Sequence, residues 1–152
     1  DPTRPDLLHS AGIEKAKTLI VAVDGKEAAV EIVRYARRIR PDLHIVARAY
    51  DRVHVYQLFQ AGANDIVREM FDASLRAGRY ALESMGVSEF DASEAEKEFY
   101  SMDRSAVKEL AELWDPSIPI LENGPYIERA KELNRDLETA LVDKGLAEKA
   151  DD

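Results

Sequence analysis

Cysteine is absent from this 152-residue sequence, and tryptophan occurs only once. Without thiols the chain cannot form disulfides, thiolate nucleophiles or zinc–sulfur sites, a composition that suits a reducing compartment. The three histidines, His9, His44 and His54, come without a Ser-His-Asp spacing or a metal-ligating cluster. We therefore expect surface or packing roles for the histidines, no metal site and no catalytic activity.

Long apolar runs and glycine-rich turns are missing as well. No apolar stretch approaches the ~20 residues that span a bilayer, and no secretory signal heads the sequence. The phosphate-binding turn G-x-G-x-x-G and the acidic residue that follows it in dinucleotide-binding folds are also absent. We expect these residues to be soluble, with any membrane part in a different segment of the polypeptide, and to hold a nucleotide only together with another segment.

The net charge of −9 is unevenly distributed. Residues 1–86 carry 13 Lys/Arg and 12 Asp/Glu, whereas residues 87–152 carry 8 Lys/Arg and 18 Asp/Glu. Clustered cations are required to bind phosphate backbones, and basic segments are required at anionic membrane surfaces. The acidic second half therefore argues against a nucleic-acid partner and against binding to an anionic membrane surface.

The first half alternates between apolar runs and helical patterns. Apolar runs at 18–23, 44–50 and 65–67 predict strands, and the first has the continuous Ile/Val composition of a strand buried on both faces. Helical spacing between them predicts helices at 25–40 and 52–62. Alternation of this kind favours an α/β fold with a parallel sheet covered on both faces.

Three strands make a poor parallel sheet, because each strand needs neighbours and cover. The pattern therefore fits the second half of a Rossmann-like doubly wound sheet whose first half is absent. An α-helical extension follows, with helices at 91–114 and from 125 to about 144, and Asp91 with Glu94 resembles a capping box. We divide the chain into 1–70, 71–86 and 87–152.

Residues 71–85 predict a helix with small side chains on one face. Ala73, Ala77 and Ala81 recur every four residues, as do Ser74 and Gly78. Small side chains at that spacing let another backbone approach closely. The helix therefore lies either on its own sheet, the reading that spacing alone favours, or against the same helix of a second subunit.

Two arginines lie at the predicted carboxyl edge of the sheet, where ligands bind in parallel folds. Arg48 belongs to the second strand and Arg68 follows the third. A guanidinium can grip a carboxylate through two parallel hydrogen bonds. A surface ion pair of little energetic value is the alternative for either arginine.

Three segments together resemble the cytosolic regulatory domain of glutathione-gated, Kef-type potassium efflux antiporters, which contains a TrkA-N (RCK/KTN) nucleotide-binding domain. They are DPTRPDLLHSAGIEKAKTLIVAVD, HIVARAYDRVHVYQLFQAGANDIVREMF and SLRAGRYALESMG. The resemblance covers residues 1–86 well and continues more loosely through 91–114. It implies a Rossmann-like domain that binds AMP or NAD(H) and is regulated by glutathione and its adducts.

The resemblance also implies roles for particular residues. Arg68 matches the arginine that grips the carboxylate of glutathione, and Asp103 falls where the family has a glutathione-contacting asparagine. Asp1 and Thr3 match part of the motif that cradles adenine, and we assign Arg48 to the same cofactor site. The dimer contact is implied for the helix that begins near residue 71, at Phe71, Ser74, Ala77, Gly78 and Ala81.

The implied partners are a second copy of the chain, a membrane-embedded antiporter domain of the same polypeptide and a flavoprotein oxidoreductase subunit. The implied location is the cytoplasmic face of the inner membrane. The helices at 91–144 are candidates for the flavoprotein contact, with Phe99, Tyr100 and Trp114 as anchors or core residues.

Other readings remain open. The chain could be a nucleotide-binding RCK domain of another potassium transporter, or a plain interaction module built from acidic helices. A receiver-like signalling module would need a clustered acidic pocket and a lysine where Arg68 stands. A dehydrogenase would need the missing glycine-rich half and a catalytic domain.

Overall fold

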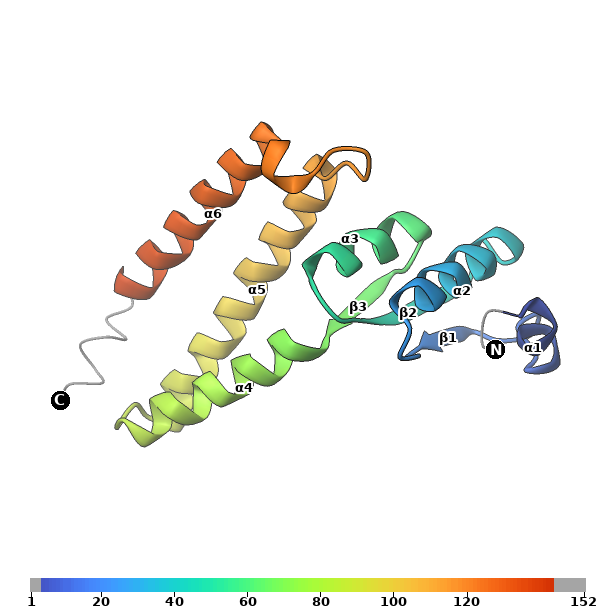
Figure 1. Ribbon diagram of the computed structural model, residues 1–152. Helices are drawn as coiled ribbons and strands as arrows, with labels where there is room; N and C mark the ends of the chain where they lie inside the picture. Colours follow the sequence, from blue (N-terminus) through green and yellow to red (C-terminus); the bar gives the residue numbers. More distant parts are fainter. Residues whose placement is uncertain (1–3, 144–152) are drawn as a thin grey trace. The chain divides into compact units, whose positions relative to one another are not determined.

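The structure, a computed structural model, describes residues 4–143 (Figure 1). The chain divides into two compact units between Asp72 and Ala73. The first unit is α/β and the second is helical, as the sequence predicts.

The first unit contains a three-stranded parallel sheet in the order β1-β2-β3. Its elements are α1 (Pro5–Ser10), β1 (Thr18–Val21), α2 (Lys26–Ile39), β2 (His44–Ala49), α3 (Arg52–Ala61) and β3 (Asp65–Arg68). The prediction of an α/β fold with a parallel sheet and a helical extension is confirmed.

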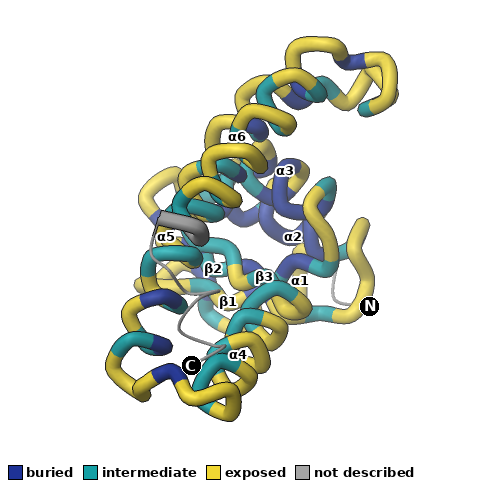
Figure 2. The backbone as a smooth tube through the Cα atoms, turned by 90° about the vertical axis from the view of Figure 1, so that its left-hand side faces the viewer, coloured by how far each residue is buried: buried dark blue, intermediate teal, exposed yellow. Residues whose placement is uncertain are grey.

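Helices α2 and α3 both cover the same face of the sheet (Figure 1). Ile45, Ala47 and Ala49 of β2 point to this face and are fully buried. The strand order runs in one direction, and right-handed crossovers then bring consecutive helices to one side. Figure 2 shows the buried residues of this unit gathered on α2, α3 and the strands beneath them.

The opposite face of the sheet corrects two predictions. The sequence predicts that residues 18–23 are buried on both sides. It also predicts that the sheet is covered on both faces. Instead β1 is an edge strand with Ile20 71% exposed, and Val67 of β3 is 47% exposed. The prediction failed because a continuous apolar run does not distinguish an edge strand from a central one.

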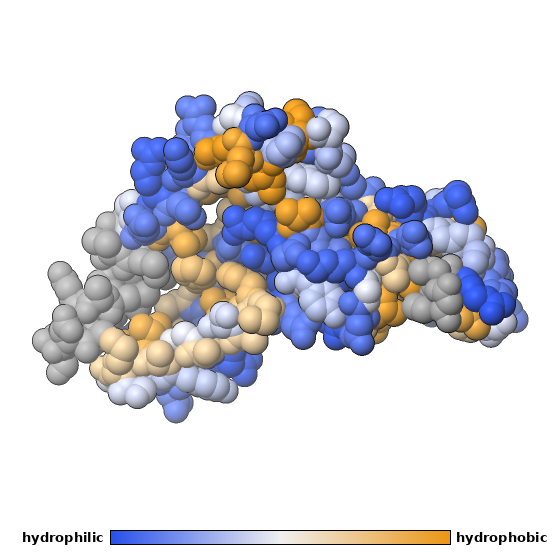
Figure 3. Space-filling model, in the orientation of Figure 1, coloured by the Kyte–Doolittle hydropathy of each residue, from blue (hydrophilic) through white to orange (hydrophobic). Residues whose placement is uncertain are grey.

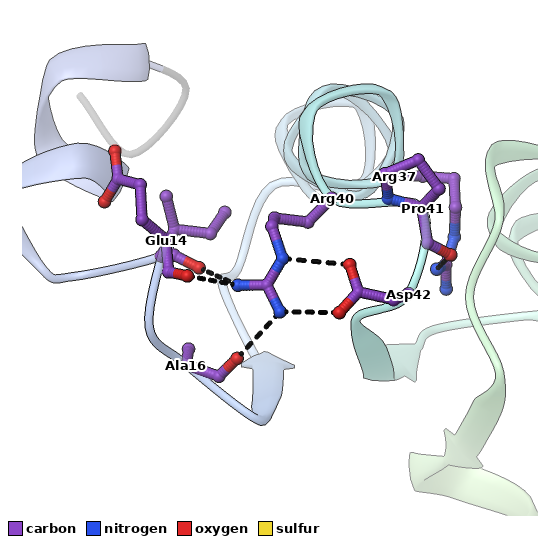
Figure 4. A network of polar contacts seen from close by, with 7 residues as sticks. Glu14, Ala16, Arg37, Arg40, Pro41 and Asp42 are labelled. Atoms are coloured by element: carbon purple, nitrogen blue, oxygen red, sulfur yellow. Dashed lines mark hydrogen bonds and ion pairs between the residues drawn. The ribbon is translucent and has the colours of Figure 1, made fainter.

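Arg40 ties the segment before β1 to the end of α2 (Figure 4). Its Nη1 donates to the carbonyl oxygens of Ile13 and Glu14 at 2.7 and 2.8 Å, and its Nη2 donates to Ala16 at 3.3 Å. Its Nε and Nη2 also bond both carboxylate oxygens of Asp42, at 3.0 and 2.9 Å. One guanidinium thereby satisfies three loop carbonyls and fixes the entry to the sheet.

Helix α4 (Glu69–Ser84) begins directly after β3, two residues earlier than predicted. Within the helix, Arg79 Nε lies 3.1 Å from Glu83 Oε1 and forms an ion pair one turn apart. None of the helix's 16 residues is buried, and Figure 2 shows α4 without a buried segment. The fold of a single chain therefore leaves the apolar and small side chains of this helix at least partly accessible.

The second unit continues with α5 (Glu89–Leu113), a short 3-10 turn η1 (Ile120–Glu122) and α6 (Gly124–Asp143). Helix α5 starts before the predicted Asp91 because Ser88 is its cap: the Ser88 hydroxyl accepts from the Asp91 N–H at 3.1 Å. Trp114 is buried, Phe99 is half-buried and Tyr100 is 39% exposed. Trp114 is therefore a core residue and not an anchor for a partner.

Among residues 4–143, no helix is long and apolar enough to cross a membrane. The same residues contain no group of three His, Asp or Glu side chains placed to hold a metal ion.

Candidate functional site

The carboxyl edge of the sheet gathers polar side chains from the ends of all three strands. Asp24 follows β1, Arg48 and Tyr50 lie at the end of β2, and Glu69 follows β3. Parallel strands place these ends at one edge, which is where ligands bind in open α/β sheets. We therefore take this edge as the candidate site.

Arg48 is the centre of the cluster. Its Nη2 donates to Asp24 Oδ1 at 3.0 Å, its Nε lies 3.7 Å from Glu69 Oε2, and its guanidinium lies 5.7 Å from the centre of the Tyr50 ring. The Nε atom is shielded from solvent, yet forms no hydrogen bond within the described residues. A shielded donor without an acceptor costs free energy, so this atom is suited to bind an anionic ligand.

The Arg48 guanidinium keeps its positive charge at this site. Burial lowers the pKa of its guanidinium, but the hydrogen bond to Asp24 and the charge of Glu69 more than offset burial, and the net shift is upward. The edge therefore presents a permanent cation flanked by two displaceable carboxylates.

His54 holds in place the two loops that carry Asp24 and Tyr50. Its side chain is 1% exposed; Nδ1 accepts from the Tyr50 N–H at 3.1 Å, and Nε2 lies 3.0 Å from the carbonyl oxygen of Lys26. Nδ1 must be unprotonated to accept, so Nε2 carries the hydrogen and donates to Lys26. Burial lowers the pKa of His54, which keeps the ring neutral. The expected packing role of this histidine is confirmed.

Asp51 and Lys26 link the same two loops through partly exposed side chains. The Asp51 carboxylate caps α3 by accepting from the His54 N–H at 2.8 Å, and it forms an ion pair with Lys26. This hydrogen bond and the ion pair hold the first turns of α2 and α3 together. The pKa of Asp51 is lowered, chiefly by Lys26.

Arg68 lies on the other face of the sheet from Arg48. Arg48 is opposite Val67 in the β2–β3 register, whereas Arg68 is opposite Ala49. Side chains alternate along a strand and paired residues share a face, so the two arginines point to opposite sides. The Arg68 guanidinium lies 4.2 Å from the centre of the Phe71 ring. The structure therefore does not bring Arg48 and Arg68 into a single anion grip.

The other predicted site residues are distributed as follows. Asp103 is half-buried on α5, in the second unit, whereas Arg68 belongs to the first. Asp1 and Thr3 lie outside the described residues. Within the predicted dimer contact, Phe71 is half-buried, while the small residues are exposed: Ser74, Ala77, Gly78 and Ala81. In Figure 3 a band of weakly hydrophobic side chains follows α4.

Sequence reasoning missed Asp24, Tyr50 and Glu69 as neighbours of Arg48. Asp24 and Tyr50 each follow a strand, so their places at the carboxyl edge could have been found from the strand assignments. Glu69 could not, because its approach to Arg48 depends on the register between β2 and β3 and on the absence of a loop before α4.

Comparisons with known proteins identify the family of both units. The family model of the TrkA-N domain matches residues 1–69, and the model of the potassium efflux system KefB C-terminal domain matches residues 73–151. Among solved structures, the Kef C-terminal domain of Shewanella denitrificans in an AMP-bound form is 41% identical, with a TM-score of 0.69. That match covers 74% of this chain and 70% of the other.

The RCK domain of GsuK is 33% identical over 44% of this chain and 15% of the other, with a TM-score of 0.43. The two family models together follow the division of the chain into an α/β unit and a helical unit. The chain thus belongs to the family of Kef-type C-terminal regulatory domains of potassium efflux systems.

Proposed function

We propose that this chain senses an anionic nucleotide at the carboxyl edge of its sheet and thereby regulates potassium efflux through a membrane antiporter domain. The observation that carries the proposal is the shielded Arg48 Nε, which has no hydrogen-bond acceptor among the described residues. A phosphate oxygen is a suitable acceptor for that donor.

AMP is the first ligand to consider, because the related Shewanella structure is described as AMP-bound. NAD(H) is the other nucleotide that the family resemblance implies. In either case we infer that Arg48 contacts phosphate or ribose, while Asp1 and Thr3 contribute to the adenine end.

Glutathione is the proposed regulatory ligand. We infer that Arg68 receives a carboxylate of the tripeptide, because a guanidinium can bind a carboxylate with two hydrogen bonds. Asp103 would repel the same carboxylates unless it meets the amine of the peptide. The position of Arg68 on the opposite face from Arg48 supports separate places for nucleotide and tripeptide.

A homodimer is the proposed assembly, with α4 as the contact. The support is that α4 has no buried residue in one chain and that Ala77, Gly78 and Ala81 are exposed along it. Along the sequence, residues 71–86 follow the nucleotide unit and precede the acidic extension, and we propose that this segment pairs the subunits. The membrane antiporter domain and a flavoprotein oxidoreductase subunit are the further proposed partners, at the cytoplasmic face of the inner membrane.

A calorimetric titration with AMP tests the nucleotide site. We expect measurable binding to the wild-type chain and a loss of at least tenfold in affinity for Arg48→Gln, about the effect of removing one charge-assisted hydrogen bond. Arg34→Gln, at an exposed position of α2, is the matched control and should bind normally. Equal affinity in all three proteins would remove Arg48 from the site.

A further inference from the structure

Glu69 lies at the junction of strand and helix. β3 ends at Arg68 and α4 begins at Glu69, so no loop residue separates them. Val67 is opposite Arg48 in the register, and alternation returns Glu69 to the same face two residues later. The first carboxylate of α4 is thereby directed toward Arg48.

The contact between Glu69 and Arg48 is an ion pair without a hydrogen bond. Glu69 Oε2 lies 3.7 Å from Arg48 Nε, beyond the range of an N–H···O bond, whereas Asp24 Oδ1 lies at 3.0 Å from Nη2. Both partners keep solvent contact, with side chains 29% and 49% exposed. Such a pair is weak and can be replaced by a stronger acceptor.

We propose that Glu69 is an internal anion that occupies the ligand's place on Arg48, and that ligand binding displaces it and releases the first turn of α4. This inference rests on the proposed function, because it assumes that the carboxyl edge receives an anionic ligand. It adds a regulatory residue to that site.

Displacement has a physical basis. A phosphate group carries more charge than a carboxylate, and it can offer Arg48 Nε the hydrogen bond that Glu69 does not make. Glu69 is also the first residue of α4, where a carboxylate is stabilised by the free N–H groups of the helix, so a released Glu69 remains compatible with the helix. The cost of displacement is therefore small.

Displacement of Glu69 affects α4, the helix that we propose as the dimer contact. A ligand can change an equilibrium only by binding one state better than the other. Displacing Glu69 provides such a difference, because the ligand-bound state lacks the contact between α4 and β2 that the free state has. Occupancy of the nucleotide site is thereby coupled to the start of α4.

Glu69→Gln tests the proposal, because it keeps the shape of the side chain and removes its charge. Asp24→Asn is the matched control: it also removes a carboxylate from Arg48, but from a loop and not from α4. Two measurements are made on the full chain, the affinity for AMP by calorimetry and the hydrogen exchange of the amides at 73–76, which bond to carbonyls of the first turn of α4.

We expect both variants to bind AMP about two- to fivefold more tightly, the effect of removing a partly exposed ion pair. Only Glu69→Gln should exchange faster at 73–76 without ligand, and only in that variant should AMP add no further change. Equal AMP affinity in wild type and Glu69→Gln, or unchanged exchange at 73–76 in ligand-free Glu69→Gln, would overturn the proposal. Absence of AMP binding in every protein would instead refute the nucleotide site, while the ligand-free exchange would still decide whether Glu69 holds α4.

Discussion

The Nε2 atom of His54 lies 3.0 Å from the carbonyl oxygen of Lys26, so a buried side chain of α3 holds the first residue of α2. The same ring accepts a hydrogen bond from the Tyr50 N–H. A single neutral imidazole therefore joins the loop between β1 and α2, which carries Asp24, to the loop between β2 and α3, which carries Tyr50.

The first prediction concerns stability against pH. The pKa of His54 is lowered from its ordinary 6.5 in the folded chain by burial. The unfolded chain therefore binds more protons below pH 6.5, so this contribution to stability is complete above that pH and is lost as the pH falls below it. Urea unfolding at pH 8.0 and 5.5 measures the loss.

His54→Gln provides the comparison, because His9 and His44 remain in both proteins. The variant should be less stable at pH 8.0 by about 1–3 kcal/mol, since at least one buried backbone group loses its partner. The difference between the two proteins should shrink at pH 5.5. An equal difference in unfolding free energy at both pH values would show that folding does not change the pKa of His54.

The second prediction concerns the Arg40–Asp42 pair. The hydrogen bonds from Arg40 lower the pKa of Asp42 to about 2, from an ordinary 3.8. The stabilisation is present above pH 3.8 and is lost as the pH falls toward 2. Asp42→Asn should therefore lower Tm at pH 6 and have little effect near pH 2, as thermal unfolding followed by circular dichroism would reveal.

Arg40→Lys tests the other half of the network. Lysine keeps the charge but cannot reach three loop carbonyls and a carboxylate with a planar fork. We expect a lower Tm than for wild type, by a few degrees. Arg34→Lys, at an exposed position of α2, should leave Tm unchanged. Equal Tm values for the two variants would show that the carbonyl contacts of Arg40 add nothing to stability.

The third prediction concerns glutathione. Arg68→Ala should weaken glutathione binding at least tenfold and leave the far-UV spectrum unchanged, because Arg68 is on the sheet rim and not in the core. If Asp103 faces the ligand's carboxylates, as the family resemblance implies, Asp103→Asn should strengthen binding by removing a like charge. Calorimetry with reduced glutathione measures both. Wild-type affinity in Arg68→Ala would remove this arginine from the site.

The fourth prediction concerns self-association. Ala77→Leu adds bulk to an exposed small position of α4, so it should disturb a close contact between two copies of this helix and leave the fold of one chain intact. Light scattering should give a smaller mass for the variant at equal concentration. Ala11→Leu, at an exposed alanine of the first unit, should keep the wild-type mass. An intact dimer in Ala77→Leu would refute the assignment of α4.

Local patterns were enough to predict much of the fold. Helix α2 was predictable because Val30, Val33 and Ala36 recur at helical spacing, and all three are buried. Strand β2 was predictable from its apolar run. Gly62 ends α3 in the left-handed conformation that a glycine cap adopts, with φ of 111°.

Tertiary arrangement explains what the sequence could not predict. Leu19, Ile20 and Val21 read as one buried run, but only the alternation of a paired edge strand decides that Ile20 points outward. Likewise Asp91 and Glu94 fit a capping box, yet Ser88 supplies the cap. The neighbours of Arg48 arise from strand register and from the junction with α4, neither of which has a local signal.

The exposed face of the sheet affects how unfolding experiments on this chain should be read. Ile20 and Val67 present apolar surface in the native state. Fluorescent dyes that bind apolar surface are a common probe for partly folded states. Such a dye can already bind to the native form of this chain, so its fluorescence has to be calibrated against near-UV circular dichroism before it is taken as a sign of a molten globule.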